Sequence, residues 1–70
     1  MSPEQIAEGF ANRMSVARRR LGLSQRKVAA LMDVDPSFVN HLEAGRRLPS
    51  LPNLYALAKL LNVKPKDLLP

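Results

Sequence analysis

The sequence predicts a small all-α domain, and three observations carry this prediction. Apolar residues recur three and four positions apart along much of the 70-residue chain, which is the period of one helix face. Residues that begin helices alternate with residues that end them. The chain has no cysteine, so helix packing must supply its stability, and a hydrophobic content of 46% permits this. We therefore expect one compact domain, residues 1–70, built from five helices.

The first helix begins with a capping signature. Ser2 is placed to cap it, Pro3 suits the first helical position, and Gln5 completes a capping box. The helix can run to Leu21, and Gly22 supplies its end. Its apolar face comprises Phe10, Met14, Ala17 and Leu21.

The next two helices are separated by a tight turn at Asp33 and Val34. Ser24 caps a helix predicted over residues 25–32, whose apolar side contains Val28, Ala29, Leu31 and Met32. Asp33 is an acceptable substitute for glycine in a left-handed turn position. Asp35 and the proline after it start a third helix, residues 36–44, which Gly45 ends. Its inward face holds Val39 and Leu42, and its outward face holds Pro36, Ser37, Asn40 and His41.

The C-terminal third of the chain carries the deepest apolar stripe. Ser50 caps a fourth helix, whose stripe comprises Leu51, Leu54, Leu57, Ala58 and Leu61. Asn62 is a natural left-handed stop. Residues 64–69 then form a short last helix that places Leu68 under the core.

Composition excludes several classes of function. An enzyme is not expected, because the chain has no cysteine, a single histidine and no acid placed to orient it as a base. Metal ligands are too few for a metal site, and we expect no cofactor. No apolar run approaches the roughly 18 residues that span a bilayer, and the N-terminus lacks a signal-peptide pattern. These features predict a cytoplasmic protein with no membrane association.

The charge of the chain favours a polyanionic partner. The formal net charge is +5, and six basic residues stand between positions 13 and 27 with no acid among them. An excess of this kind indicates non-specific association with polyanions.

With the helices placed, nearly the whole chain from Phe10 onward resembles the helix-turn-helix family of phage lambda-type and Cro-type repressors, the xenobiotic-response-element family. The resemblance is carried by Leu21-Gly22-Leu23-Ser24-Gln25, Val28-Ala29, Val34-Asp35-Pro36-Ser37-Phe38-Val39, Leu42-Glu43-Ala44-Gly45-Arg46-Arg47, Pro49-Ser50-Leu51, Leu54, Leu57-Ala58, Leu61, Val63 and Asp67-Leu68-Leu69. It implies a lambda-repressor-like fold whose second and third helices form the helix-turn-helix. The sequence departs from the family pattern at Asp33 and Asn62, where glycine is common, and at Lys64, where a small polar cap is usual.

The resemblance also implies roles for three residues. Gln25 resembles the family's glutamine that binds a backbone phosphate and braces the recognition helix. Glu43 resembles the acid that pairs with an arginine of the first helix, and Arg18 occupies the position of that arginine. The alternative for Glu43 is an exposed acid in the last turn, unfavourable against the helix dipole.

The outward face of the third helix is expected to read bases in the major groove of DNA. The candidates are Pro36, Ser37, Asn40 and His41. Asn40 can pair with adenine through two hydrogen bonds, and serine can serve several bases. His41 contacts guanine or phosphate, or is an ordinary solvated histidine. Phe38 is a half-packed brace or a contact for a thymine methyl group.

Phosphate contacts are expected at two helix starts and one loop, because helix N-termini favour anions. The candidates are Ser24, Gln25, Asn53, Arg46 and Arg47, the two arginines being mobile charges on the loop before the fourth helix.

The sequence thus predicts a sequence-specific regulator of transcription that binds double-stranded DNA in the cytoplasm, associated with the nucleoid. We expect a repressor or autoregulator that binds a pseudopalindromic operator as a homodimer. The predicted dimer interface comprises Tyr55, Leu60 and Leu69, which are alternatively scattered surface apolar residues. The alternative function is an interaction module, either an antitoxin-like subunit or an activator that contacts RNA polymerase.

Overall fold

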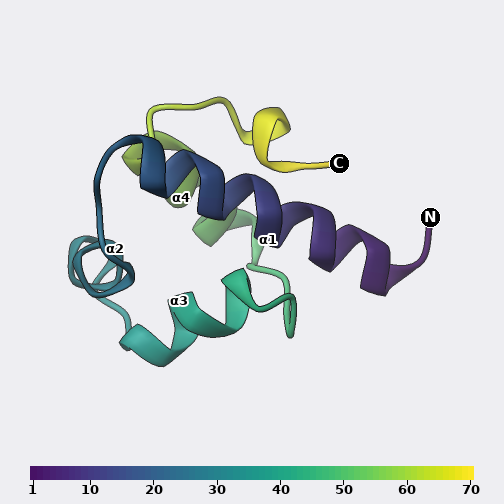
Figure 1. The fold of residues 1–70 in the computed structure, drawn as a ribbon, viewed down its shortest axis with the longest axis horizontal. Helices are drawn as coiled ribbons and strands as arrows, with labels where there is room; N and C mark the ends of the chain where they lie inside the picture. Colours follow the sequence, from purple (N-terminus) through teal and green to yellow (C-terminus); the bar gives the residue numbers. More distant parts are fainter.

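The computed structural model describes residues 1–70 and contains four α-helices followed by one 3-10 helix (Figure 1). The α-helices are α1 (Pro3–Arg20), α2 (Gln25–Met32), α3 (Pro36–Glu43) and α4 (Leu51–Leu60). The all-α prediction is confirmed, but the last helix, η1 (Pro65–Leu68), is a single turn of 3-10 helix. A segment this short cannot establish an α-helical ladder, and the Lys64 side chain gives it no cap.

Each α-helix begins at a side chain that caps it. Ser2 Oγ accepts a hydrogen bond from the Gln5 amide at 3.2 Å, and Gln5 Oε1 accepts one from the Ser2 amide at 2.8 Å, which completes the predicted capping box. The caps of α2, α3 and α4 are Ser24, Asp35 and Ser50. These side chains satisfy amides that have no partner within the helix.

Each α-helix also ends in the same way. A residue with positive φ follows it: Gly22 (70°), Asp33 (58°), Gly45 (72°) and Asn62 (60°). The amide of the following residue then bonds to a carbonyl five positions earlier, as from Leu23 to Arg18 at 3.2 Å. The predicted left-handed stops, including Asp33 and Asn62 in place of glycine, are therefore confirmed.

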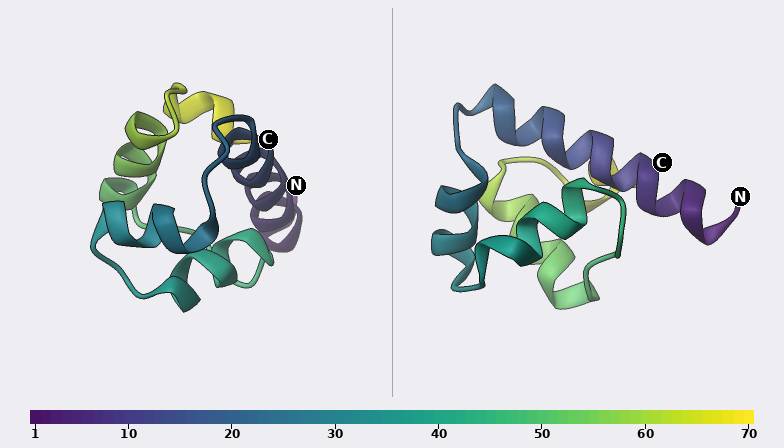
Figure 2. Two further views of the ribbon diagram at one scale, coloured as in Figure 1. Left: turned by 60° about the vertical axis from the view of Figure 1, so that its left-hand side comes forward. Right: turned by 60° about the horizontal axis from the view of Figure 1, so that its bottom comes forward.

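The core lies at the centre of the molecule and is surrounded by α1, α2, α3, α4 and η1 (Figure 2). α1 packs against α3 and η1, α2 against α3 and α4, and α4 against η1. Leu68 is 1% exposed, as predicted for a residue under the core. The buried cluster comprises Phe10, Met14, Ala17, Val28, Ala29, Val39, Leu42, Leu54, Leu57, Ala58, Leu61 and Leu68.

Three leucines assigned to apolar helix faces are exposed. Leu21 lies beyond the last turn of α1, and Leu51 occupies the first position of α4, before that helix meets the core. Leu31 comes three residues after the buried Val28 on α2 and is 54% exposed. The predicted apolar stripes therefore extend beyond the part of each helix that the other elements cover.

The N-terminal turns of α1 pack against two distant segments. Ala7 is buried, and a Cβ added at Gly45 would lie 3.7 Å from Glu8 Cα. A Cβ added at Gly9 would lie 2.7 Å from Pro70 Cβ, so the end of the chain sits directly on α1. None of the helices has the length and apolar character needed to cross a membrane.

Candidate nucleic-acid interface

The outer face of α3 is polar and uncovered. Val39 and Leu42, on the inward face of the helix, are fully buried. The four side chains of the predicted outward face are exposed: Pro36, Ser37, Asn40 and His41. α3 lies at the edge of the molecule, on the opposite side of α1 from η1 (Figure 1). The structure therefore brings the four predicted base-contacting residues together on one accessible surface.

The start of α3 is fixed by Asp35. Its carboxylate accepts a hydrogen bond from the Ser37 amide at 2.8 Å. Hydrogen bonding to Ser37, through the backbone amide first and the side chain second, lowers the pKa of Asp35. The ionised cap also faces the positive end of the helix dipole, so the first turn of α3 is well held.

Arg18 and Glu43 form a two-pronged ion pair between α1 and the last turn of α3. Arg18 Nε lies 2.5 Å from Glu43 Oε2, and Nη2 lies 2.9 Å from Oε1. The two side chains are 11% and 5% exposed. Arg18 Nη1 also donates to the Leu23 carbonyl at 2.8 Å. This places the two residues as the family resemblance implied, and Glu43 is not a solvated acid.

The ion pair shifts both ionisation equilibria toward the charged forms. Burial raises the pKa of Glu43, but hydrogen bonds from Arg18 and Gln25 outweigh it, so the net pKa is lowered. The hydrogen bond to Glu43 raises the pKa of Arg18. The pair is thus ionised at neutral pH.

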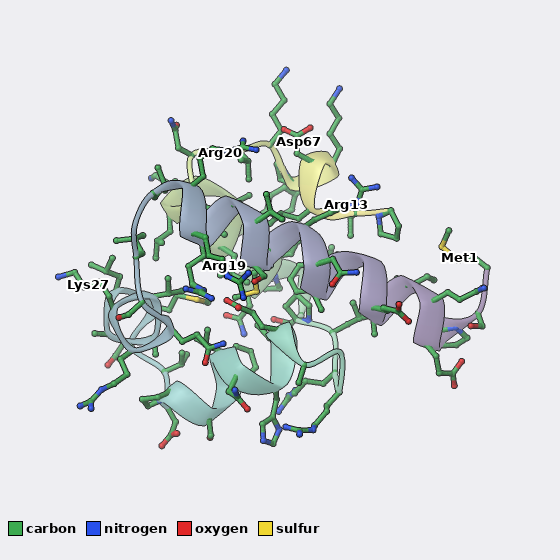
Figure 3. The ribbon with its side chains drawn as sticks, in the orientation of Figure 1. Met1, Arg13, Arg19, Arg20, Lys27 and Asp67 are labelled. Atoms are coloured by element: carbon green, nitrogen blue, oxygen red, sulfur yellow. The ribbon has the colours of Figure 1, made fainter.

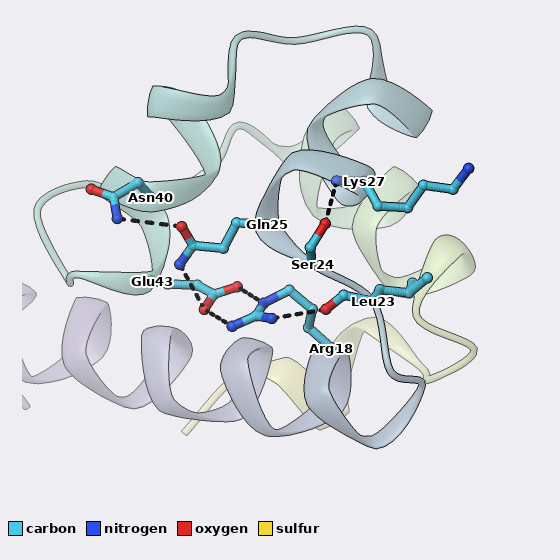
Figure 4. A network of polar contacts seen from close by, with 7 residues as sticks. All are labelled: Arg18, Leu23, Ser24, Gln25, Lys27, Asn40 and Glu43. Atoms are coloured by element: carbon cyan, nitrogen blue, oxygen red, sulfur yellow. Dashed lines mark hydrogen bonds and ion pairs between the residues drawn. The ribbon is translucent and has the colours of Figure 1, made fainter.

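Gln25 connects this pair to the outer face of α3 (Figure 4). Its Nε2 donates to Glu43 Oε1 at 3.2 Å, and its Oε1 accepts from Asn40 Nδ2 at 3.3 Å. The first residue of α2 therefore contacts α3 at two positions, one buried and one exposed.

Phe38 is half buried and packs against the core, and Arg47 lies over its ring at 4.9 Å from the centroid. A cation over an aromatic face at an exposed site contributes about 0.5–1 kcal/mol. Arg47 was expected to be a mobile loop charge and is instead held against α3. Sequence reasoning missed this contact, because it depends on the path of the loop.

The residues predicted to contact phosphates occupy the starts of α2 and α4. Ser24 is exposed, and its Oγ accepts from the Lys27 amide at 3.0 Å, which leaves the hydroxyl hydrogen free to donate. Asn53 is half buried, and its amide donates to Ser50 Oγ at 3.3 Å. Arg46 is exposed on the loop before α4.

The basic stretch between positions 13 and 27 does not form one patch. The charge of Arg18 is neutralised by its ion pair with Glu43. Arg13 and Arg20 lie with Asp67 on the side of α1 opposite α3, whereas Lys27 projects from α2 (Figure 3). Only part of the positive charge therefore lies near α3.

The predicted dimer residues differ in exposure. Tyr55 is 61% exposed and Leu69 is 40% exposed, whereas Leu60 is half buried and packs against the core. Leu51, which the sequence assigned to the core, is 68% exposed. Leu51 directly follows the cap of α4, and this position in the sequence was the signal that could have predicted its exposure. No group of three or more His, Asp or Glu side chains is placed to hold a metal ion.

The chain matches the model of the helix-turn-helix family HTH_3 over residues 16–68. It is 40% identical over 47 residues to the control protein C.BamHI of Bacillus amyloliquefaciens. That match covers 67% of this chain, and the chain spans only 58% of the length of that relative.

Solved structures show the same similarity. The restriction-modification controller protein C.AhdI from Aeromonas hydrophila has a TM-score of 0.82 and 37% identity, over 89% of this chain and 94% of that one. A hypothetical transcription factor, NHTF, from Neisseria has a TM-score of 0.88 and 26% identity, over 100% of this chain and 80% of that one. The resemblance drawn from the sequence is confirmed: the chain belongs to the HTH_3 helix-turn-helix family.

Proposed function

We propose that this protein is a transcription regulator that binds double-stranded DNA sequence-specifically, with α3 in the major groove. One observation carries the proposal. The exposed face of α3 presents hydrogen-bonding groups on Ser37 and Asn40, and nothing in the chain covers them. In helix-turn-helix proteins these N-terminal positions of the second helix meet base edges.

The surroundings of α3 support this docking. The α2 start, with Ser24 and Gln25, lies beside α3 and offers amides and side-chain donors to a phosphate. Arg46 and Arg47 follow the other end of α3. Phosphate contacts at both ends would fix the depth and register of the helix, while Ser37 and Asn40 read the sequence.

We propose further that the protein acts as a homodimer on a pseudopalindromic operator. One module offers few base contacts, and a symmetric pair reads two half-sites about 34 Å apart. Tyr55 on α4 and Leu69 near the chain end are exposed, and together with the partly buried Leu60 they suit an interface between two copies.

The relatives suggest the kind of system that the protein controls. C.AhdI is a restriction-modification controller protein, and its chain is matched over 94% of its length. C.BamHI is named as a control protein. We infer that this protein is also a controller of a restriction-modification system.

Selection of bound sequences from a random DNA pool tests the proposal. The expected product is a motif with two inverted halves whose centres are about 10 base pairs apart. Recovery of unenriched sequence would refute base reading, and a single unrepeated half-site would refute the dimeric arrangement.

A reporter gene placed behind the selected operator then separates repression from activation. Repression or autoregulation predicts lower expression when the protein is present. Higher expression that depends on the distance between operator and promoter would instead identify an activator that contacts RNA polymerase.

A further inference from the structure

We infer that Gln25 and Glu43 fix the direction in which the Asn40 side-chain amide faces, and that this direction makes adenine the base Asn40 selects. The inference rests on the proposed function and deepens it. Asn40 is the residue that touches the base, and Gln25 and Glu43 are positioning residues that act through it.

The fixed direction begins at the buried end of the hydrogen-bond chain. The Glu43 carboxylate has only acceptor atoms, and Arg18 occupies both of its oxygens with donors. The group next to Glu43 Oε1 must therefore also be a donor. Gln25 meets this requirement only by presenting Nε2, which lies 3.2 Å away.

The orientation of Gln25 then determines that of Asn40. With Nε2 turned to Glu43, the Oε1 of Gln25 points to Asn40, and only a donor can approach it. Asn40 presents Nδ2 at 3.3 Å. A reversed Asn40 amide would bring two oxygens together, and a reversed Gln25 would set its oxygen against the Glu43 carboxylate.

The atoms of Asn40 that remain available match one base. Its Oδ1 and its second N–H face outward, since the first N–H is used by Gln25. Adenine offers the complementary pair in the major groove, an N6 donor and an N7 acceptor. Guanine offers two acceptors there, and cytosine offers a donor at N4, so neither satisfies both atoms.

The inner end of this hydrogen-bond network is buried, and its outer end is exposed. The Glu43 side chain is 5% exposed, whereas Asn40 is exposed to solvent. The direction of a surface amide is thus set by a charge that lies beneath the surface. Without this network of hydrogen bonds, both directions of the Asn40 amide would be available, and the side chain would have to become ordered on binding.

Gln25→Met tests the inference, because methionine keeps the length of the side chain and removes both hydrogen bonds. Affinities are measured for four duplexes that differ only at the base read by Asn40. If half of the Asn40 amides reverse, the affinity for adenine relative to the other bases falls at least about twofold. Preferences at the position read by Ser37 should not change. An unchanged adenine preference would overturn the inference.

Arg46→Ala is the matched control. Gln25 is also a proposed phosphate contact, and the loss of a phosphate contact weakens all four duplexes equally. Gln25→Met must therefore change the ratio among the duplexes, whereas Arg46→Ala changes only their common affinity. A purely structural role for Gln25 would give the Arg46→Ala result and overturn the inference.

NMR relaxation of the Asn40 side-chain NH₂ group tests the same point without DNA. The group should be ordered in the native protein and mobile in Gln25→Met and in Glu43→Gln. Equal mobility in all three proteins would overturn the inference. If the native protein prefers no base, the proposed function fails, while the NMR result still decides whether the amide direction is fixed.

Discussion

α3 is held by two interfaces of different chemistry. Toward the core it buries Val39 and Leu42 completely among apolar side chains. Toward α1 and α2 it is held by the ion pair of Glu43 with Arg18 and by the hydrogen bonds of Gln25. Apolar burial is non-directional and supplies stability. Hydrogen bonds are directional, so the polar interface fixes how α3 is rotated and which groups it presents.

The largest effect is expected when one partner is removed from the polar interface. Glu43→Ala leaves the Arg18 guanidinium buried without its counter-charge, which costs about 3–5 kcal/mol of unfolding free energy. Urea unfolding followed by circular dichroism measures the loss. A loss below about 1 kcal/mol would show that the pair is solvated in solution.

The double variant Arg18→Met with Glu43→Leu sharpens this comparison. Replacing both charges by apolar groups of similar size should recover most of the stability, because no uncompensated charge remains. Discrimination among bases should still be weaker than in the native protein, because the Gln25 side chain has lost the Glu43 carboxylate as its acceptor. Recovery of both properties would mean that the polar interface does not set the discrimination among bases.

Truncation in the apolar core gives the next effect. Leu57 is fully buried, and Leu57→Ala should cost about 2–5 kcal/mol through lost burial and the cavity left behind. Leu51 belongs to the same helix but is 68% exposed, so Leu51→Ala should stay within about 0.5 kcal/mol. Equal losses in urea unfolding would contradict the burial difference between the two leucines.

A smaller effect is expected on binding instead of folding. It distinguishes the residues that contact bases from those that contact phosphates. Asn40→Ala should change the preference at one base position by about 1–3 kcal/mol. Arg46→Ala should weaken binding to all sequences alike and reduce its salt dependence. Titrations against a panel of site variants at several salt concentrations check both, and identical profiles for the two variants would defeat the assignment.

Protonation of Glu43 perturbs the same ion pair without a substitution. The pKa of this carboxyl is lowered in the folded protein from its ordinary value of 4.5. Its contribution to stability is therefore complete above about pH 4.5 and is lost as the pH falls through the lower folded pKa. The difference in urea midpoint between the native protein and Glu43→Gln should be constant from about pH 7 to pH 5 and shrink below that. A difference that grows on acidification would contradict the sign of the shift.

Much of the fold could be predicted because its signals are local. Ser24 and Asp35 cap helices through hydrogen bonds to amides two or three residues away. Asp33 and Asn62 take positive φ because short polar side chains tolerate it. Each of these choices depends on a few neighbouring residues, which the sequence displays directly.

The remainder depended on contacts between distant segments. The exposure of Leu31 and Leu51 depends on which parts of α2 and α4 the other elements cover, which periodicity does not encode. The stacking of Arg47 on Phe38 depends on the path of a loop. The outward face of α3 could be predicted from spacing, whereas the link from Gln25 to Asn40 required coordinates.

The central claim is that the exposed face of α3 meets the bases of DNA. NMR titration of the isotope-labelled protein with its selected operator tests this most directly. We expect the largest chemical-shift changes on the α3 amides from Ser37 to His41 and on the Asn40 side-chain NH₂ group, with α4 amides near Lys59 little changed. Largest changes on α4 and η1, with α3 unaffected, would contradict it.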